Sequence, residues 1–352
     1  MNTDVFNKTM KNPMKLLYTS MWDGNDAVNN ADIEESFVKI DKESCKVVTS
    51  KNSYSFSGKD KAETLIKVFG INEENRDLFK KKFDMACGGS GQEERRITTL
   101  HSSSLCALLF FYNVTDNHPL TIKGVGTFKE SVFEFRSPVR DEEHPSCMDV
   151  VLIGEDEEHK PLVLFLESKF SEYYTSAVNK LDRISDFYIA EDSFGKAFYD
   201  EQFLATLGTK RSETKDGYFS LISDEKYYIG GIKQMISHYV GVRNNLAGTF
   251  ASQKNPMQND VIDAIKTGAQ VKLAEILFDR IVGDFTIEES VTCKESYSKK
   301  YRKLAKKMND DIESVGLKGE FSVLSDDLYY YDLFFDSGYE IEQNVRKYYF
   351  GK

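Results

Sequence analysis

The segment Pro161–Phe170, PLVLFLESKF, limits the possible folds more than any other part of the chain. It is almost continuously apolar up to Leu166, with no polar residue on either face of the strand it would form. A strand of that kind lies in the middle of a sheet, with both faces covered. Helices usually provide the cover, so the segment predicts an α/β (α+β) protein with a central sheet flanked by helices.

Two further strands are expected directly before this one, at 131–139 (SVFEFRSPV) and 147–154 (CMDVVLIG). The charged turn EDEEHK connects the second of them to PLVLFLESKF. Apolar residues with helical spacing predict a helix within 92–114, before the strands. The remaining elements expected after the strands are helices at 172–189, 224–245 and 295–310, a strand at 270–279, and a strand with an aromatic segment at 321–335.

The glycine cluster CGGSG, residues 87–91, is a natural boundary between two parts of the chain. Residues 1–86 are interpreted as an accessory N-terminal region, with a hairpin at 46–58 and two helices after it. Residues 87–336 are expected to form one domain, interrupted by an insertion at about 190–223. The last residues, 337–352, are expected to be a C-terminal tail packed on the core.

Composition narrows the possible functions of the 352-residue chain. Its longest apolar run, Leu105–Tyr112, is far shorter than a membrane span, and the polar start favours a cytoplasmic protein. Five cysteines without a C-x-x-C pair suit reduced thiols rather than a zinc site. A net charge of −11 means that nucleic acid could be bound only through a local basic face.

Three E-x-K triplets occur in the chain, so the triplet alone carries little information. Glu158/Lys160 lies in the charged turn and Glu213/Lys215 in a polar stretch, whereas Glu167/Lys169 ends the most apolar strand. Side chains alternate across a strand, so Glu167 and Lys169 share one face. The alternative interpretation is an ordinary salt bridge at the edge of a sheet.

Asp149 lies early in the preceding strand, and a hairpin through the turn brings it toward the end of PLVLFLESKF. Two carboxylates side by side repel each other and require a compensating cation. Mg²⁺, or Mn²⁺ in its place, binds one or two carboxylates together with water and phosphate oxygens, and it activates bound water. Lys169 could then orient that water and offset negative charge on phosphorus.

These residues resemble the motif of the PD-(D/E)XK nuclease superfamily, which has the restriction-endonuclease-like fold. The resemblance implies that Asp149 and Glu167 bind the metal and that Lys169 completes the catalytic site. It also implies a glutamate on the first core helix, for which Glu93 is the candidate and Glu94 the alternative. The element order agrees over roughly 88–335, but Met148 stands where the motif's proline would be.

A basic stripe within 295–310 is the candidate nucleic-acid interface, with a solvated helix face as the alternative. Its positive residues are Lys299, Lys300, Arg302, Lys303, Lys306 and Lys307. Gln234 resembles a glutamine that some superfamily members carry on the helix after the lysine strand, and it is a further candidate contact. The five histidines show no paired metal spacing and are interpreted as structural or solvent-facing.

The sequence therefore predicts a Mg²⁺-dependent nuclease, an endonuclease-like phosphodiesterase that hydrolyses DNA. The resemblance to this superfamily also suggests a bacterial enzyme of restriction or defence. RNA is the alternative substrate, and a homodimer is a possible oligomeric state. One alternative is a catalytically inactive protein of the same fold that binds nucleic acid or a protein partner. Another is a metal-dependent hydrolase of a small phosphoester.

Overall fold

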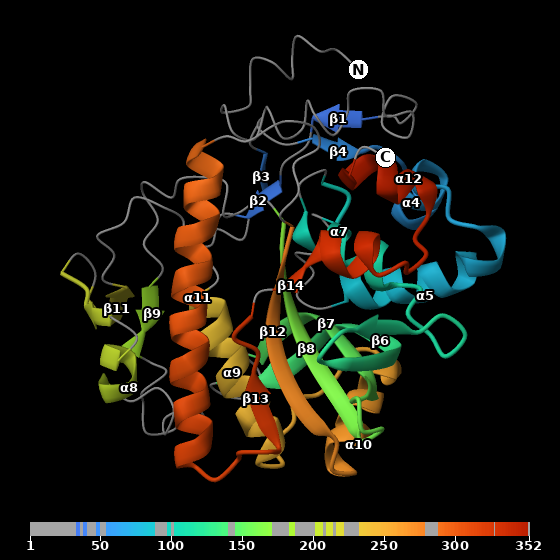
Figure 1. Ribbon diagram of the computed structural model, residues 1–352. Coiled ribbons are helices and arrows are strands. Elements are labelled where there is room, and N and C mark those ends of the chain that lie inside the picture. The colour runs from blue at the N-terminus through green and yellow to red at the C-terminus, as the bar shows by residue number, and fades with distance from the viewer. Residues whose placement is uncertain are drawn as a thin grey trace.

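Figure 1 shows the computed structural model of the chain, an α/β protein whose strongly curled mixed sheet is packed with helices. The structure describes residues 33–35, 38–40, 47–49, 54–88, 97–99, 102–139, 145–170, 183–186, 201–206, 209–213, 216–221, 232–278, 288–326 and 328–350.

Six strands form the main sheet in the order β13-β12-β8-β7-β6-β5, and the short strand β14 also pairs with β12. β5 to β8 are antiparallel neighbours, whereas β12 runs parallel to β8 and β13 parallel to β12. The strands are β5 (Leu120–Ile122), β6 (Gly126–Pro138), β7 (Pro145–Glu155), β8 (Pro161–Lys169), β12 (Gln270–Leu277), β13 (Phe321–Val323) and β14 (Leu328–Tyr329).

β8 is the central strand that its sequence predicts. Residues from Leu162 to Lys169 are all buried, and the strand pairs with β7 on one side and with β12 on the other. The segment EDEEHK forms the turn between β7 and β8, as expected. Within it, Asp156 accepts hydrogen bonds from the backbone N–H groups of Glu158 and Lys160.

Helices cover the sheet and its ends (Figure 1). Three further short helical turns connect them: η1 (Glu73–Asn75), η4 (Pro256–Gln258) and the π-helical η5 (Asp332–Asp336). The helices are α4 (Lys61–Phe69), α5 (Arg76–Cys87), α7 (Ser103–Phe111), α9 (Ile232–Leu246), α10 (Asn259–Lys266), α11 (Glu288–Ser314) and α12 (Gln343–Phe350).

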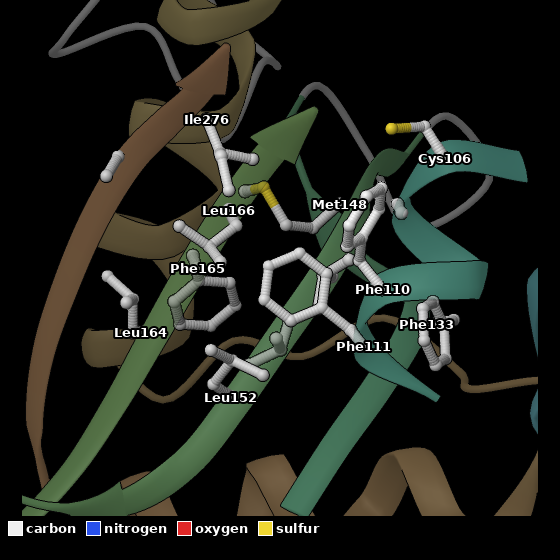
Figure 2. Packing of buried hydrophobic residues seen from close by; sticks show 14 of the residues in the cluster. Cys106, Phe110, Phe111, Phe133, Met148, Leu152, Leu164, Phe165, Leu166 and Ile276 are labelled. Carbon is white, nitrogen blue, oxygen red and sulfur yellow. The ribbon is translucent and has the colours of Figure 1, made fainter. Parts of the chain in front are cut away.

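α7 is apolar on every side, as a helix buried on every side must be. All seven residues from Leu105 to Phe111 are buried, and Figure 2 shows Phe110 and Phe111 beside the sheet residues Met148 and Leu152. The helix begins at Ser103 because the Ser102 hydroxyl accepts a hydrogen bond from Leu105 N. It is therefore shorter than the helix expected within 92–114, of which 92–96 lie outside the described residues.

α9 approaches the sheet closely at Gly241. A Cβ atom at that position would lie 2.7 Å from the Ser137 Cβ of β6. Asn245 and Asn244, one turn further along, donate hydrogen bonds to Ser137 Oγ and Pro138 O. These contacts fix the helix that carries Gln234 and His238 against β6 and β7.

The hydrophobic core runs from the N-terminal helices through α7 to the last helix. Phe69 of α4 lies edge-on to Tyr348 of α12, with ring centroids 5.3 Å apart, and Phe278 after β12 stacks on Phe350. The division at 86/87 and 336/337 stays a prediction. None of the helices in the described part of the chain has the length and apolar character that a membrane crossing requires.

Two local predictions are wrong. β3 (Val47–Thr49) and β4 (Tyr54–Phe56) do not form a hairpin with each other, because β3 pairs with β2 (Val38–Ile40) and β4 with β1 (Ile33–Glu35). Of the helix expected at 172–189, only residues 183–186 are described, and Arg183–Ser185 form the strand β9 there instead, because pairing with β11 overrides the local helical pattern.

Two strands in the described part of the predicted insertion form a small sheet with β9, which precedes the insertion. Its strand order is β10-β11-β9, with both pairings antiparallel. Its elements after β9 are α8 (Glu201–Thr206), β10 (Thr209–Arg211) and β11 (Tyr218–Leu221).

Candidate active site

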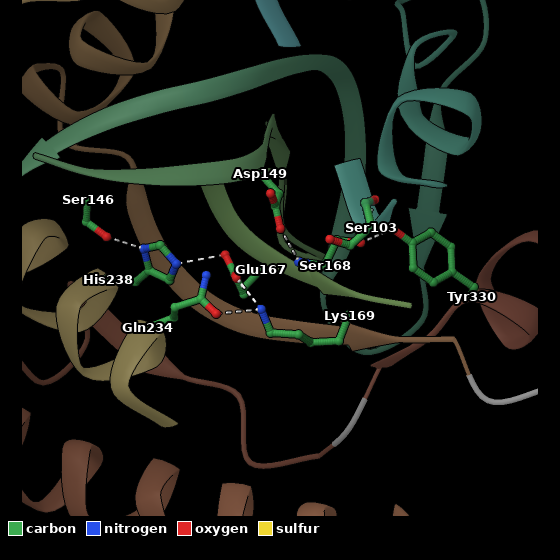
Figure 3. Close-up of polar contacts among 9 residues, drawn as sticks. All are labelled: Ser103, Ser146, Asp149, Glu167, Ser168, Lys169, Gln234, His238 and Tyr330. Atoms are coloured by element: carbon green, nitrogen blue, oxygen red, sulfur yellow. Dashed lines mark hydrogen bonds and ion pairs between the residues drawn. The ribbon is translucent and has the colours of Figure 1, made fainter. Parts of the chain in front are cut away.

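Glu167 and Lys169 lie at the end of β8, on the same face of the sheet (Figure 3). Their exposed fractions are only 2% and 3%. Lys169 Nζ donates to Glu167 Oε1 at 2.5 Å. The triplet that the sequence singled out is therefore a buried ion pair and not a solvated one.

α9 supplies two further side chains to this pair. His238 Nε2 lies 2.7 Å from Glu167 Oε2, and Gln234 Oε1 accepts a hydrogen bond from Lys169 Nζ at 2.9 Å. The other ring nitrogen of His238 lies 2.6 Å from Ser146 Oγ of β7. Residues 234 and 238 are one helical turn apart, so both face β8.

Asp149 of β7 lies beside Glu167. The pairing of β7 with β8 extends to Val150↔Leu166, so Asp149 and Glu167 are the next pair. Asp149 Oδ2 accepts a hydrogen bond from Ser168 N at 2.8 Å, as Figure 3 shows. Among the described residues, no donor contacts the other carboxylate oxygen.

Ser168 points to the opposite face of the sheet, as alternation along β8 requires. Its hydroxyl donates to Ser103 O at 3.2 Å and shares a hydrogen bond of 2.8 Å with Tyr330 OH. Since Ser103 begins α7 and Glu167 contacts α9, these two helices cover opposite faces of β8. The end of β8 is thus held from both sides.

Two more acids complete a row across the sheet. Glu275 of β12 is in register with Glu167, and Glu134 of β6 lies between the register pairs Phe133↔Val150 and Phe135↔Met148, opposite Asp149. Glu275 is 1% exposed and Glu134 5% exposed. Neighbouring strands are about 4.8 Å apart, so four acids succeed one another at that spacing.

Glu134 also has an unusual backbone conformation. Its φ angle is +51°, one of two positive values among the non-glycine residues of the described chain. A non-glycine residue in this left-handed region costs about 1 kcal/mol or more, and such residues concentrate at functional sites. Here the conformation interrupts the β6 ladder beside Asp149.

The ionisation of Glu167 is controlled by its two partners. Burial alone would raise the pKa of its carboxyl, but Lys169 and His238 outweigh burial and lower the pKa to about 2. Glu167 is therefore a carboxylate at neutral pH, and its two oxygens both accept hydrogen bonds.

Asp149 has the opposite balance. Burial and the neighbouring charge of Glu167 raise the pKa of its carboxyl well above the usual range, and Glu134 adds to the rise. Lys169 and the Ser168 N–H lower that pKa but do not compensate. The described neighbours of Asp149 thus disfavour its carboxylate form, which a further cation beside it would stabilise.

A divalent cation is the group that such a donor set suits best. Asp149 has an oxygen without a donor and Glu167 is ionised, and Mg²⁺ needs only one or two protein carboxylates because water and phosphate supply its other ligands. In the described chain, no group of three or more Asp, Glu, His or Cys side chains is arranged to hold a metal by itself. A metal here would thus be shared with substrate and water.

The other residues predicted for the site are placed as follows. Glu93 and Glu94 lie outside the described residues, as does the side chain of Lys300. The basic helix exists as α11, which is longer than expected and packs against α9 and β13. Its side chains at Lys299, Arg302, Lys303 and Lys306 are exposed, whereas Lys307 is half-buried.

Sequence reasoning missed His238, Glu134 and Glu275. Both glutamates stand between apolar residues, in VFEFR and LAEIL, which is a weaker form of the signal that identified Glu167, because β6 and β12 carry other charges as well. His238 follows Gln234 by four residues on a helix, so the two side chains lie on the same helix face, and Gln234 was already a predicted site residue. Without the strand order, none of the three could be assigned to one end of the sheet.

Comparison with known proteins adds no relative: no family model, no curated protein and no solved structure matches the chain.

Replacing Asp149 by asparagine is expected to stabilise the protein. Asparagine keeps an oxygen for the Ser168 N–H and removes the charge that burial and Glu167 disfavour. The free energy of unfolding at pH 7 should therefore be higher in Asp149→Asn than in the wild type, because the carboxylate form is disfavoured in the folded state. Urea unfolding without divalent cations measures it.

Asp156→Asn is the matched control. Asp156 lies in the exposed turn, where two backbone N–H groups favour its ionised form and lower its pKa. The same substitution should bring no gain in stability there. A loss of stability in Asp149→Asn, or equal gains in both variants, would contradict this description of the site.

Proposed function

We propose that the chain is a Mg²⁺-dependent nuclease that hydrolyses DNA phosphodiester bonds, on a restriction-endonuclease-like core. The proposal gives Asp149 and Glu167 to the metal and Lys169 to the substrate phosphate. Mn²⁺ would serve in place of Mg²⁺, because it prefers the same oxygen ligands.

One observation carries the proposal: Asp149, whose carboxylate form its neighbours disfavour, stands immediately beside an ionised Glu167 and a buried lysine. A buried charge that raises its neighbour's pKa destabilises the folded state. Such an arrangement is expected where a cation joins during function. A structural ion pair needs only Glu167 and Lys169.

When bound, Mg²⁺ supplies a Lewis acid that polarises phosphate oxygens and activates water. The oxygen of Asp149 that lacks a donor and one oxygen of Glu167 would hold it, the latter by exchanging a hydrogen bond from Lys169 or His238. His238, itself fixed by Ser146, keeps the other oxygen of Glu167 in place.

Lys169 provides the fixed positive charge of the site. Its ammonium group is held by Glu167 and Gln234 and is almost completely buried. A charge fixed in a protein interior stabilises developing negative charge more strongly than one in water. In hydrolysis of a phosphodiester it would donate a hydrogen bond to a phosphate oxygen.

The substrate class follows from the exposed face of α11. Lys299, Lys303 and Lys306 lie on that face, and α11 packs against α9, the helix that carries Gln234 and His238. A chain with a net charge of −11 needs such a local basic face to approach a polyanion. We assign this face to the DNA backbone, with RNA as the other substrate of the same charge.

A second candidate function is a catalytically inactive nuclease fold that binds nucleic acid or a protein partner. Its support is that both oxygens of Glu167 are already engaged, by Lys169 and by His238. If that network never opens, no metal binds and the basic face alone has a function.

Cleavage of DNA should require a divalent metal and all three residues. With Mg²⁺ or Mn²⁺, the wild type is expected to cut linear, supercoiled or single-stranded DNA, and Glu167→Gln and Lys169→Met should each be about 100-fold slower or worse. The measurement is a gel assay of strand breakage over time, with melting curves to show that each variant is folded.

Another E-x-K triplet of the chain, Glu158/Lys160, provides the control. Glu158 and Lys160 form an exposed ion pair in the turn, so Glu158→Gln and Lys160→Met repeat the substitutions outside the site. They should leave cleavage unchanged. Absence of cutting by the wild type on every DNA and RNA substrate would favour the inactive candidate.

Neutralising the basic face should weaken binding and its salt dependence together. Each phosphate contact contributes about 0.9 to the slope of log K against log salt. The triple variant Lys299→Ala/Lys303→Ala/Lys306→Ala should therefore show a slope shallower by about 0.9 for each lysine that contacts a phosphate. Fluorescence anisotropy with a labelled duplex at several salt concentrations measures this.

Three exposed lysines elsewhere give a control of equal charge: Lys59, Lys67 and Lys81. Alanine at these positions removes the same charge outside α11. If both triple variants lose affinity equally, net charge alone decides binding and the basic face has no specific role.

A further inference from the structure

A cavity lies past the C-terminal end of α7, whose first residue, Ser103, contacts Ser168 at the end of β8. The cavity has a volume of about 760 Å³ and lies between the end of α4, the start of α5, the loop after α7 and the segment before α12. That volume is within the range of ligand pockets, about 300 to 1,000 Å³. Glu167 faces α9, so this cavity is separate from the candidate active site.

The walls of the cavity are polar and negatively charged. Glu74, Glu340 and Glu342 line it, and neither lysine nor arginine does. Six carboxamide side chains also line it, and these can donate and accept hydrogen bonds: Asn72, Asn75, Asn113, Asn117, Gln343 and Asn344.

Helix dipoles do not determine the sign of the electrostatic potential in the cavity. α4 and α7 end at the cavity, whereas α5 and α12 begin there. Each helix end is equivalent to about half a charge, positive at the start and negative at the end, so the contributions oppose one another. The side-chain carboxyls therefore determine which ligand charge is favoured, and that charge is positive.

Glu342 is the most informative residue of the lining. Its Oε1 accepts a hydrogen bond from Tyr112 OH, and the backbone N–H of Glu342 itself also donates to this carboxyl. Burial raises the pKa of this carboxyl to about 7, with no cation among the causes to lower it. A half-buried carboxyl with two neutral donors and no cationic partner among the described residues is suited to a ligand that brings a positive charge.

We propose that this cavity binds a small organic cation of the guanidinium or alkylammonium class. The positive group would meet the carboxyl of Glu342, and the carboxamide oxygens would accept hydrogen bonds from its remaining N–H groups. Butylguanidinium and spermidine are the probes, and butylurea is the uncharged counterpart of the first. This proposal is independent of the nuclease function.

Calorimetry of the full-length chain provides the first measurement. At least one of the two cations should bind saturably, and butylurea should bind at least about tenfold more weakly, since a charge-assisted hydrogen bond is lost. Because Glu342 is about half protonated at pH 7, binding should release roughly half a proton, measured in buffers of different ionisation heat.

The affinity should rise with pH between 6 and 8, as Glu342 loses its proton. The other titratable groups that line or contact this site are Tyr112, Glu74, Glu340 and His118.

Glu342→Gln is the decisive variant, because glutamine retains an acceptor for Tyr112 OH and nearly the same volume. It should keep the melting temperature close to that of the wild type, weaken cation binding about tenfold and abolish proton release. Glu320→Gln, an exposed acid elsewhere, should bind as the wild type does.

Three outcomes would overturn the proposal. They are no binding of either cation by the wild type, equal binding of butylurea and butylguanidinium, and unchanged affinity in a folded Glu342→Gln variant. DNA cleavage should be the same in Glu342→Gln and the wild type, so failure here leaves the nuclease proposal untouched.

Discussion

The buried pair of Glu167 and Lys169 is the interaction around which the middle of the sheet is organised. Removing two charges from water is costly, and a buried pair is tolerated only when its remaining donors and acceptors are satisfied. Gln234 and His238 do this from α9, and Ser146 in turn fixes His238. The close approach of α9 to β6 at Gly241 is thus part of the same arrangement.

Side chains alternate along β8, so one face of the strand end carries structural contacts and the other carries the charged residues of the candidate site. Ser168 faces α7 and joins Ser103 and Tyr330 in an uncharged network, whereas its two neighbours face α9 with their charges. Asp149 bridges the two strands through the Ser168 N–H. Burial and the charge of Glu167 disfavour the ionised form of Asp149. The geometry that holds the strand end therefore also creates a position that a cation would stabilise.

The main elements were predictable from the sequence because their patterns are local and strong. The apolar run of β8, the charged turn before it and the all-apolar α7 each specify one structure, and Glu167 was found as a charge within an apolar strand. Pairing between distant strands was not predictable. β4 pairs with β1 instead of β3, and β9 replaces part of an expected helix, because partners far along the chain decide such strands. For the same reason Glu134, Glu275 and His238 could not be placed beside Asp149 before the strand order was known.

Metal binding by the 352-residue chain tests most directly whether Asp149 and Glu167 form a cation site. The measurement is a calorimetric titration with Mn²⁺, in the presence and absence of a DNA duplex, for the wild type and Asp149→Asn. The geometry predicts saturable binding by the wild type, strengthened by DNA, and its loss in the variant. No binding by the wild type under either condition, or equal binding by both proteins, would contradict the assignment of Asp149 and Glu167 to a metal.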